Sequence, residues 1–126
     1  MQIDHLDHLV LTVQDIERTC EFYARALGMQ VVTFGEGRKA LHFGNQKINL
    51  HQKGKEFDPK AQYPTPGSAD LCFLTSIPLE QVIAHLQSCH VSLLLGPVER
   101  TGATKSLVSI YFRDPDGNLL EISNAL

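Results

Sequence analysis

Residues 109–123, SIYFRDPDGNLLEIS, decide how this chain folds. They predict a strand, a tight turn and a second strand, because Pro115 presets φ for a turn and Gly117 tolerates a positive φ. Side chains alternate between the two faces of a strand, so this hairpin has one apolar and one polar face. The polar face carries Ser109, Tyr111, Arg113 and Glu121. It is expected to line a site; the alternative is an ordinary solvated hairpin.

The composition limits the classes of function. The chain has 126 residues, 43% hydrophobic and 20% charged, which is ordinary for one globular domain with a buried core. Its net charge of -3 offers no basic surface to nucleic acid or anionic membranes. No apolar run approaches the ~20 residues of a membrane helix, and the N-terminal residues show no secretory signal. We therefore expect a cytoplasmic protein whose partner is a small molecule, with no nucleic acid and no membrane.

Three scattered cysteines, Cys20, Cys72 and Cys89, argue against a disulfide scaffold and for a reducing compartment. Their spacing matches no thiolate zinc site, so any metal must be bound by His, Asp or Glu. Cys72 is expected on the same strand face as Asp70, where it lines a pocket or packs as an ordinary buried thiol.

Hydrophobic periodicity predicts the same order of elements twice, which makes an α+β protein of two tandem βαβββ units. The first half is predicted to contain a strand at 6–13, a helix from the N-cap Asp15 to Gly28, and strands at 30–34, 39–43 and 47–52. The second half is predicted to contain a strand at 70–75, a helix at 78–89, strands at 91–95, 107–112 and 119–123, and an irregular loop at 98–105. The polar residues 53–69 are a linker or a loop over a pocket.

The polar faces of these strands predict a metal site. The first unit offers His8, Asn49 and His51, and the second offers Asp70 and Glu121. A cupped sheet brings such imidazole and carboxylate groups to one concave centre. Nitrogen and carboxylate ligands suit Mn, Fe, Ni, Co or Zn, and two or three protein ligands leave positions open for a substrate.

Four segments carry a resemblance to a known family: YFRDPDGNLLE at 111–121, FYARALGM at 22–29, KINLHQ at 47–52 and PGSADLC at 66–72. They resemble the vicinal oxygen chelate superfamily of glyoxalases, bleomycin-resistance proteins and extradiol dioxygenases. Within this superfamily, the segments most resemble the single-domain glyoxalase domain-containing protein 5 group, whose bacterial members are described as virulence-associated. The resemblance implies one domain over 1–126, with repeat units at about 5–52 and 70–123 that form cupped mixed sheets.

The resemblance implies a ligand set for the metal. His8 matches the first-strand histidine ligand of the family, and Glu121 matches its last-strand glutamate. Asp70 falls where most members have a second histidine, so an anionic triad favouring a harder ion such as Mn²⁺ or Fe²⁺ is expected. Asn49 falls where glyoxalase I has a glutamate, which argues against methylglyoxal–glutathione isomerisation. His51 is a further ligand, a general base or plain lining of the site.

The resemblance also implies an activity. A metal-dependent lyase or isomerase of glyoxalase type, which chelates adjacent oxygens of a small substrate, is the leading prediction. The alternatives are an Fe(II) extradiol-type dioxygenase and a ligand-sequestering protein of bleomycin-resistance type. His51 and Tyr111 are the candidate catalytic groups, and the candidate substrate contacts are Asn49, Arg100, Ser109 and Arg113. A homodimer is expected, with sites that take His8 from one chain and Asp70 and Glu121 from the other; the alternative is a monomer that closes on itself.

Overall fold

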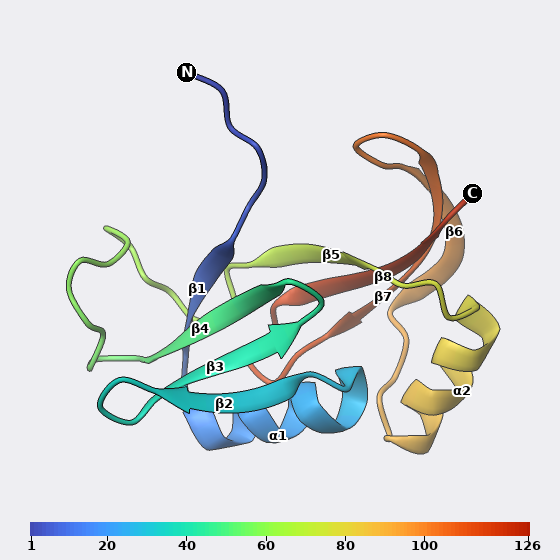
Figure 1. The fold of residues 1–126 in the computed structure, drawn as a ribbon. Helices are drawn as coiled ribbons and strands as arrows, with labels where there is room; N and C mark the ends of the chain where they lie inside the picture. The colour runs from blue at the N-terminus through green and yellow to red at the C-terminus, as the bar shows by residue number, and fades with distance from the viewer. The chain divides into compact units, whose positions relative to one another are not determined.

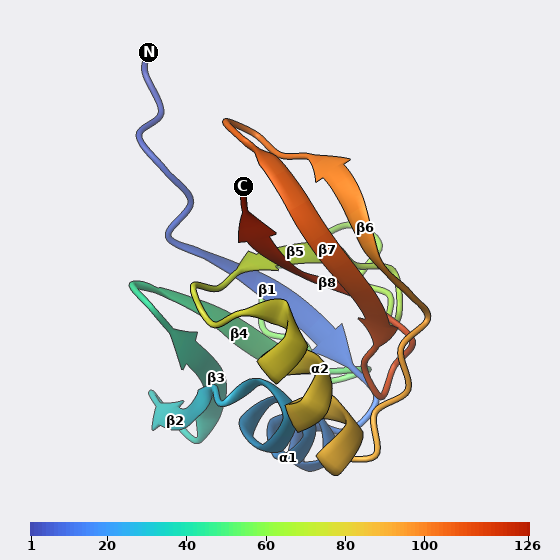
Figure 2. The ribbon, with the colours of Figure 1, turned by 90° about the vertical axis from the view of Figure 1, so that its right-hand side faces the viewer.

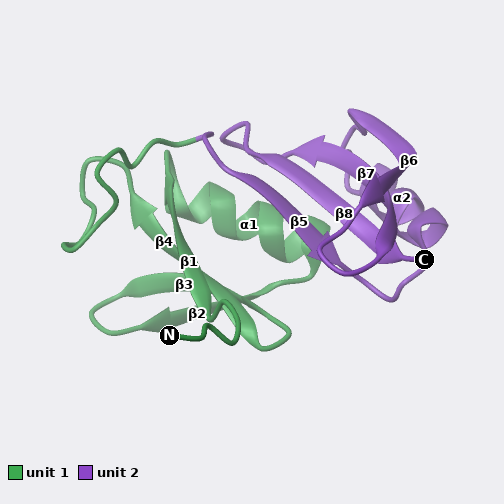
Figure 3. Ribbon diagram, turned by 90° about the horizontal axis from the view of Figure 1, so that it is seen from above, with its two compact units in different colours: residues 1–66 green, residues 67–126 purple.

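The computed structural model describes residues 1–126 as two compact units, residues 1–66 and residues 67–126 (Figure 3). The first unit contains β1 (His8–Val13), α1 (Ile16–Leu27), β2 (Gln30–Phe34), β3 (Arg38–Phe43) and β4 (Gln46–Gln52). The second contains β5 (Asp70–Leu74), α2 (Leu79–Ser88), β6 (Leu95–Thr101), β7 (Ser106–Arg113) and β8 (Leu119–Ala125). The predicted order of a strand, a helix and three strands in each half is therefore confirmed.

Each unit forms a four-stranded mixed sheet, in the order β1-β4-β3-β2 in the first and β5-β8-β7-β6 in the second (Figures 1 and 2). In both units the first strand pairs in parallel with the last strand, and the remaining pairs are antiparallel. This topology matters for function. The strand that carries His8 lies beside the strand that carries His51, and the strand of Asp70 lies beside that of Glu121.

Helix α1 covers one face of the first sheet (Figure 1). Its N-cap is Asp15, whose carboxylate accepts a hydrogen bond from the Arg18 N–H at 3.1 Å, and its C-cap is Gly28, which has a φ of 67°. Tyr23 and Ile48 are fully buried in this layer. Each contributes about 1.5–3 kcal/mol through the apolar surface it removes from water. Neither α1 nor α2 is long and apolar enough to cross a membrane.

The second unit packs α2 against its sheet, in contact with β8. Pro78, which precedes α2, offers no side-chain cap. The cap comes instead from Asn124 on β8, whose Oδ1 accepts a hydrogen bond from the Leu79 N–H at 2.9 Å. The Nδ2 of Asn124 donates to the carbonyl oxygens of Thr75 and Ile77 at 2.8 and 2.9 Å. One side chain of the last strand therefore ties down both the end of β5 and the start of the helix.

The turn between β7 and β8 is built around the Asp114 carboxylate. Its Oδ1 accepts from the backbone N–H groups of Asp116 and Asn118, both at 2.9 Å, and its Oδ2 accepts from the Asn118 side chain at 2.7 Å. The Oδ1 of buried Asn118 in turn accepts from the Ala69 N–H at 2.9 Å, just before β5. The turn therefore fixes where Asp70 begins its strand beside β8.

One predicted strand is wrong. The structure places no strand at 91–94, and β6 instead occupies 95–101, most of it within the predicted loop at 98–105. The prediction took Gly96-Pro97 as the end of a strand. A proline is tolerated here because β6 is an edge strand, and its pairing with β7 shifts register between Leu95 and Val98. A Cβ on Gly96 would lie 2.5 Å from the carbonyl oxygen of Ser109, so only glycine fits this close approach.

Candidate functional site

A cleft of about 570 Å³ opens on the sheet face of the second unit. Its polar side chains include Cys72 on β5, Arg100 on β6, Tyr111 on β7, Glu121 on β8 and Lys105 in the loop between β6 and β7. Its apolar lining includes Leu74 and Leu107. Tyr111 and Glu121 are directly paired across β7 and β8, which places them on the same face of the sheet. The volume is that of a small-molecule site.

Arg100 and Tyr111 contact each other within this cleft. The Nε–H of Arg100 donates a hydrogen bond to the Tyr111 hydroxyl oxygen at 2.9 Å, and its guanidinium carbon lies 5.4 Å from the centre of the tyrosine ring. Because the hydroxyl oxygen accepts from Arg100, the phenolic proton remains available to a ligand. Arg100 also donates from Nη1 to the carbonyl oxygen of Glu99 at 3.0 Å, which fixes the orientation of the guanidinium group.

Glu121 is supported by buried hydroxyl groups. Ser123 donates to the Glu121 Oε1 at 3.3 Å, and the hydroxyl oxygens of Ser109 and Ser123 lie 2.6 Å apart. A hydroxyl has a single proton, so when Ser123 donates to the carboxylate, Ser109 must donate to Ser123. Both serines are fully buried. Ser109, predicted as a substrate contact, is therefore buried and does not line the cleft, and it acts on Glu121 through Ser123.

Cys72 is paired with Glu121 across β5 and β8, and its Sγ lies 3.4 Å from the Ser123 hydroxyl oxygen. Burial raises the pKa of this thiol above its usual value; the hydrogen bond to Ser123 opposes that shift, and the charge of Glu121 adds to it. The thiol therefore stays protonated at neutral pH. Asp70 is exposed and stands two residues before Cys72 on the same face of β5, but it does not line the cleft.

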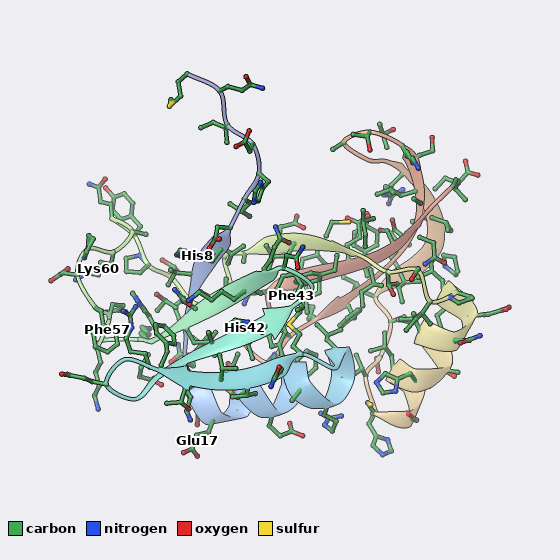
Figure 4. The ribbon with its side chains drawn as sticks, viewed as in Figure 1. His8, Glu17, His42, Phe43, Phe57 and Lys60 are labelled. Atoms are coloured by element: carbon green, nitrogen blue, oxygen red, sulfur yellow. The ribbon has the colours of Figure 1, made fainter.

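In the first unit, His8 stands at the start of β1 (Figure 4). Its Nδ1 lies 2.8 Å from an Asp7 carboxylate oxygen, and its side chain is 44% exposed. The hydrogen bond from His8 holds the pKa of Asp7 below its usual value, so Asp7 is ionised at neutral pH. A carboxylate on Nδ1 selects the tautomer in which Nε2 is the acceptor, which is the arrangement that a metal-binding histidine requires.

Asn49 and His51 lie on the same face of the first sheet, two residues apart on β4. Both are buried, with 7% and 3% of their surfaces exposed. Burial lowers the pKa of His51 below its usual value, and the nearby positive charge of Arg38 lowers it further. His51 is therefore neutral at pH 7. The ring of Phe57, from the loop after β4, packs edge-on against it with 5.6 Å between the ring centres.

The structure brings only part of the predicted site together. Arg100, Tyr111 and Glu121 meet in the cleft. Arg113 is exposed and donates from Nη1 to the Gly117 carbonyl oxygen at 3.1 Å, so it is held by the turn. No group of three or more His, Cys, Asp or Glu side chains in the chain is placed to hold a metal.

The proposed metal ligands are divided between the units: the first supplies His8, and the second supplies Asp70 and Glu121. Their chemistry fits a divalent ion. One imidazole, oriented by Asp7, and two carboxylates, one of them supported by a hydroxyl, are suitable donors.

Sequence reasoning missed three residues. Ser123 is two positions after Glu121 on a strand, so alternation alone places it on the same face. Lys105 adds a cation to the cleft and was assigned to an irregular loop. Arg38 shares a strand face with Ala40, which pairs with Asn49, but a residue at the start of a strand gives no signal of its own.

Comparison with known proteins places these features in a family. The sequence pattern of the Glyoxalase/Bleomycin resistance protein/Dioxygenase superfamily matches residues 5–122. Virulence protein STM3117 of Salmonella typhimurium is 61% identical over 123 residues, which are 98% of this chain and 85% of that protein. Glyoxalase domain-containing protein RDO1 of Mycosarcoma maydis is 56% identical over 124 residues, 98% of this chain and 70% of that protein. The crystal structure of the Salmonella protein superimposes with a TM-score of 0.98 at 60% identity, over 100% of both chains.

Proposed function

This chain belongs to the glyoxalase/bleomycin resistance protein/dioxygenase superfamily, and on that premise we propose that it is a metal-dependent lyase or isomerase of glyoxalase type. Its substrate is a small molecule with oxygens on adjacent carbons. The observation that carries the proposal is the cleft of the second unit. There a carboxylate supported by buried serines stands beside a phenol and a guanidinium in the lining of a cavity of about 570 Å³.

His8, Asp70 and Glu121 would hold a divalent metal such as Mn, Fe, Ni, Co or Zn. When bound, the metal supplies Lewis acidity that polarises adjacent oxygens of the substrate. Ser123 donates a hydrogen bond to the Oε1 atom of Glu121 and so helps to orient this carboxylate. Asp7 holds the His8 ring so that Nε2 is presented.

The remaining side chains bind the substrate and move its proton. Arg100 and Lys105 attract negative charge on the substrate, and Tyr111 donates a hydrogen bond to its oxygen. Neutral His51 is the candidate to accept a proton, because an imidazole with a lowered pKa is unprotonated at pH 7. Asn49 is a candidate contact for a hydroxyl of the substrate, since its Oδ1 has no hydrogen-bond partner.

We further propose that the two units act as one domain and that two cytoplasmic chains pair as a homodimer. Each sheet has one face covered by a helix. The other face leaves Val10 of β1 and Leu74 of β5 exposed, at 45% and 66% of their surfaces. A second copy of the chain would cover these side chains. Each site would then take His8 from one chain and Asp70 and Glu121 from its partner.

The first test is elemental analysis of protein purified without chelator or affinity tag. Near-stoichiometric metal in the wild type, lost in both His8→Ala and Glu121→Gln, supports the proposal. The matched controls are His5→Ala and Glu36→Gln, which change exposed residues outside the site and should keep the metal. Wild-type protein that holds no metal and takes up none on reconstitution would overturn the metal-dependent function and leave a ligand-binding protein.

Mixing two inactive variants tests the shared site. A dimer of one His8→Ala chain and one Glu121→Gln chain contains one intact site and one that lacks both ligands. Random pairing of equal amounts therefore restores about one quarter of the wild-type metal content. If each chain builds its own site, the mixture binds no metal.

The same preparations separate the alternative functions. A ferrous, air-sensitive site with oxygen-dependent turnover of catechols selects dioxygenase chemistry. Tight binding of a ligand without turnover, unchanged in Glu121→Gln, selects a sequestering protein.

A further inference from the structure

The first unit contains a cation held between two aromatic rings. The guanidinium carbon of Arg38 lies 5.0 Å from the ring centre of Phe34 and 4.6 Å from that of Phe57. The Nζ of Lys47 lies 4.4 Å from the same Phe34 ring. Figure 4 shows that Phe57 comes from the loop that follows β4. Two positive charges are thus gathered around one aromatic side chain, although like charges repel.

Arg38 and Lys47 form no ion pair with a carboxylate, although the charge of Lys47 helps to lower the pKa of Asp7. The ion pairs of the chain join Asp7 with His8, Glu21 with Arg25, and Asp58 with Lys60, so neither Arg38 nor Lys47 takes part in one. Glu56 is the only acid among the charged groups that act on the neighbouring His51. Its Oε2 already accepts a hydrogen bond from the Gly54 N–H at 3.0 Å.

Two polar atoms here are buried without a hydrogen-bond partner. They are the Nε of Arg38, a charged donor, and the Oδ1 of Asn49, an acceptor on a side chain that is 7% exposed. An unpaired buried polar group costs about 1–3 kcal/mol, and more when it is charged. The two residues share a face of the sheet, because Asn49 pairs with Ala40 and Arg38 is two residues before Ala40 on β3. A ligand that accepts from one and donates to the other removes both costs.

We propose that Arg38, Lys47 and Asn49 form a subsite for the anionic end of a 2-hydroxy acid, with the acid group on the two cations and the hydroxyl on Asn49. Phe34 and Phe57 hold the guanidinium group in place, so little conformational freedom is lost on binding. Neutral His51 adds no third positive charge at pH 7. A carboxylate and a phosphate group share the required chemistry, which is a planar or tetrahedral set of anionic oxygens.

The inference deepens the proposed function because it gives the substrate a chemical class. It rests on the proposed function only where it treats the bound acid as the substrate of the enzyme. Binding itself requires no metal and no turnover. The test is therefore done on metal-free protein of full length, by isothermal titration calorimetry and by following the backbone amide resonances of residues near Arg38. The probes are lactate, propionate and inorganic phosphate.

Lactate should bind roughly three- to tenfold more tightly than propionate, because only lactate offers a hydroxyl to the Asn49 Oδ1. Asn49→Leu should abolish that preference while leaving propionate binding unchanged. Arg38→Met removes the positive charge but keeps an unbranched apolar side chain, and it should weaken binding of the acids by roughly ten- to hundredfold. Arg18→Gln, which removes the charge of an exposed arginine on α1, is the control and should bind as the wild type does.

The outcomes distinguish the possible ligands. Binding of phosphate that exceeds that of lactate and is lost in Arg38→Met supports the cationic subsite but assigns it to phosphate esters. Lys47→Met provides a second loss of charge if Arg38→Met does not fold. The inference is overturned if no probe binds, or if binding is unchanged in both variants, in which case the arginine only packs the loop. If elemental analysis finds no metal in the wild-type protein, the proposed metal-dependent function fails, but the binding of these acids to the metal-free protein is unaffected.

Discussion

Replacing Asn118 with alanine tests whether the β7–β8 turn sets the start of β5. The side chain of Asn118 is 1% exposed and makes two hydrogen bonds that alanine lacks. Its Oδ1 accepts from the Ala69 N–H at 2.9 Å, and its Nδ2 donates to the Asp114 carboxylate at 2.7 Å. In the variant, the Ala69 N–H loses its partner, and the carboxylate loses a charge-assisted bond in a buried place.

The magnitude follows from these two losses. An unpaired donor costs about 1–3 kcal/mol, and a hydrogen bond to a charged group contributes about 1.5–3 kcal/mol. Ala69 is only partly buried, so water relieves some of the first cost. We expect Asn118→Ala to lower the free energy of unfolding by about 3 kcal/mol. With a urea dependence of about 1.5 kcal/mol per molar, the midpoint falls by about 2 M.

The assay is urea denaturation followed by far-ultraviolet circular dichroism, at one fixed protein concentration. Asn45→Ala is the control, because Asn45 lies in the exposed turn between β3 and β4. Its free energy of unfolding should change by less than about 0.5 kcal/mol. A loss below about 1 kcal/mol in Asn118→Ala would refute the reasoning, since it would show that the buried turn network contributes no more than an exposed side chain.

Three further predictions concern the site and the sheet beneath it. Ser123→Ala removes the donor to Glu121 and should weaken metal binding by about tenfold or more, measured by competition with a chromogenic chelator; unchanged affinity would contradict the role given to the serine. Because the pKa of His51 is lowered from 6.5 in the folded state, the unfolded chain takes up a proton first as the pH falls. The contribution of neutral His51 to stability is thus full above about pH 6.5 and is lost as the pH falls through its folded pKa, so His51→Gln should show a flatter dependence of stability from about pH 7 to about pH 5. Gly96→Ala introduces a Cβ 2.5 Å from the Ser109 carbonyl oxygen at a φ of +110°, and it should cost about 2 kcal/mol or more of unfolding free energy; an unchanged thermal midpoint would show that β6 shifts without strain.

Much of the fold was predictable because it depends on local rules. Asp15 and Gly28 mark the ends of α1 through capping and a left-handed φ, as the sequence predicted. Alternation placed Tyr111 and Glu121 on one face, and the structure pairs them directly. The β6 strand was missed because its pairing depends on a register shift at Gly96, which is decided by the neighbouring β7 and not by local preference.

The candidate site was predictable in part, for the same reason. Alternation identified Tyr111 and Glu121, Arg100 was a candidate substrate contact in a predicted loop, and the structure gathers all three in one cleft. Nothing in the sequence indicated that Ser109 is fully buried, away from the cleft lining, and contacts Ser123. Whether a hydroxyl faces a ligand or supports another side chain depends on which strand lies beside it. The sheet topology decides which strands lie side by side.

The sequence by itself determined the order of elements and the residues that share a face, because both follow from the geometry of a single backbone segment. Only the tertiary structure decided which segments are neighbours, and so which polar atoms are paired. The Nε of Arg38 and the Oδ1 of Asn49 show the difference. Each is an ordinary polar atom in the sequence, and each loses water without gaining a partner when β3, β4 and the following loop pack together. An unpaired polar atom is a property of its surroundings, which no local pattern encodes.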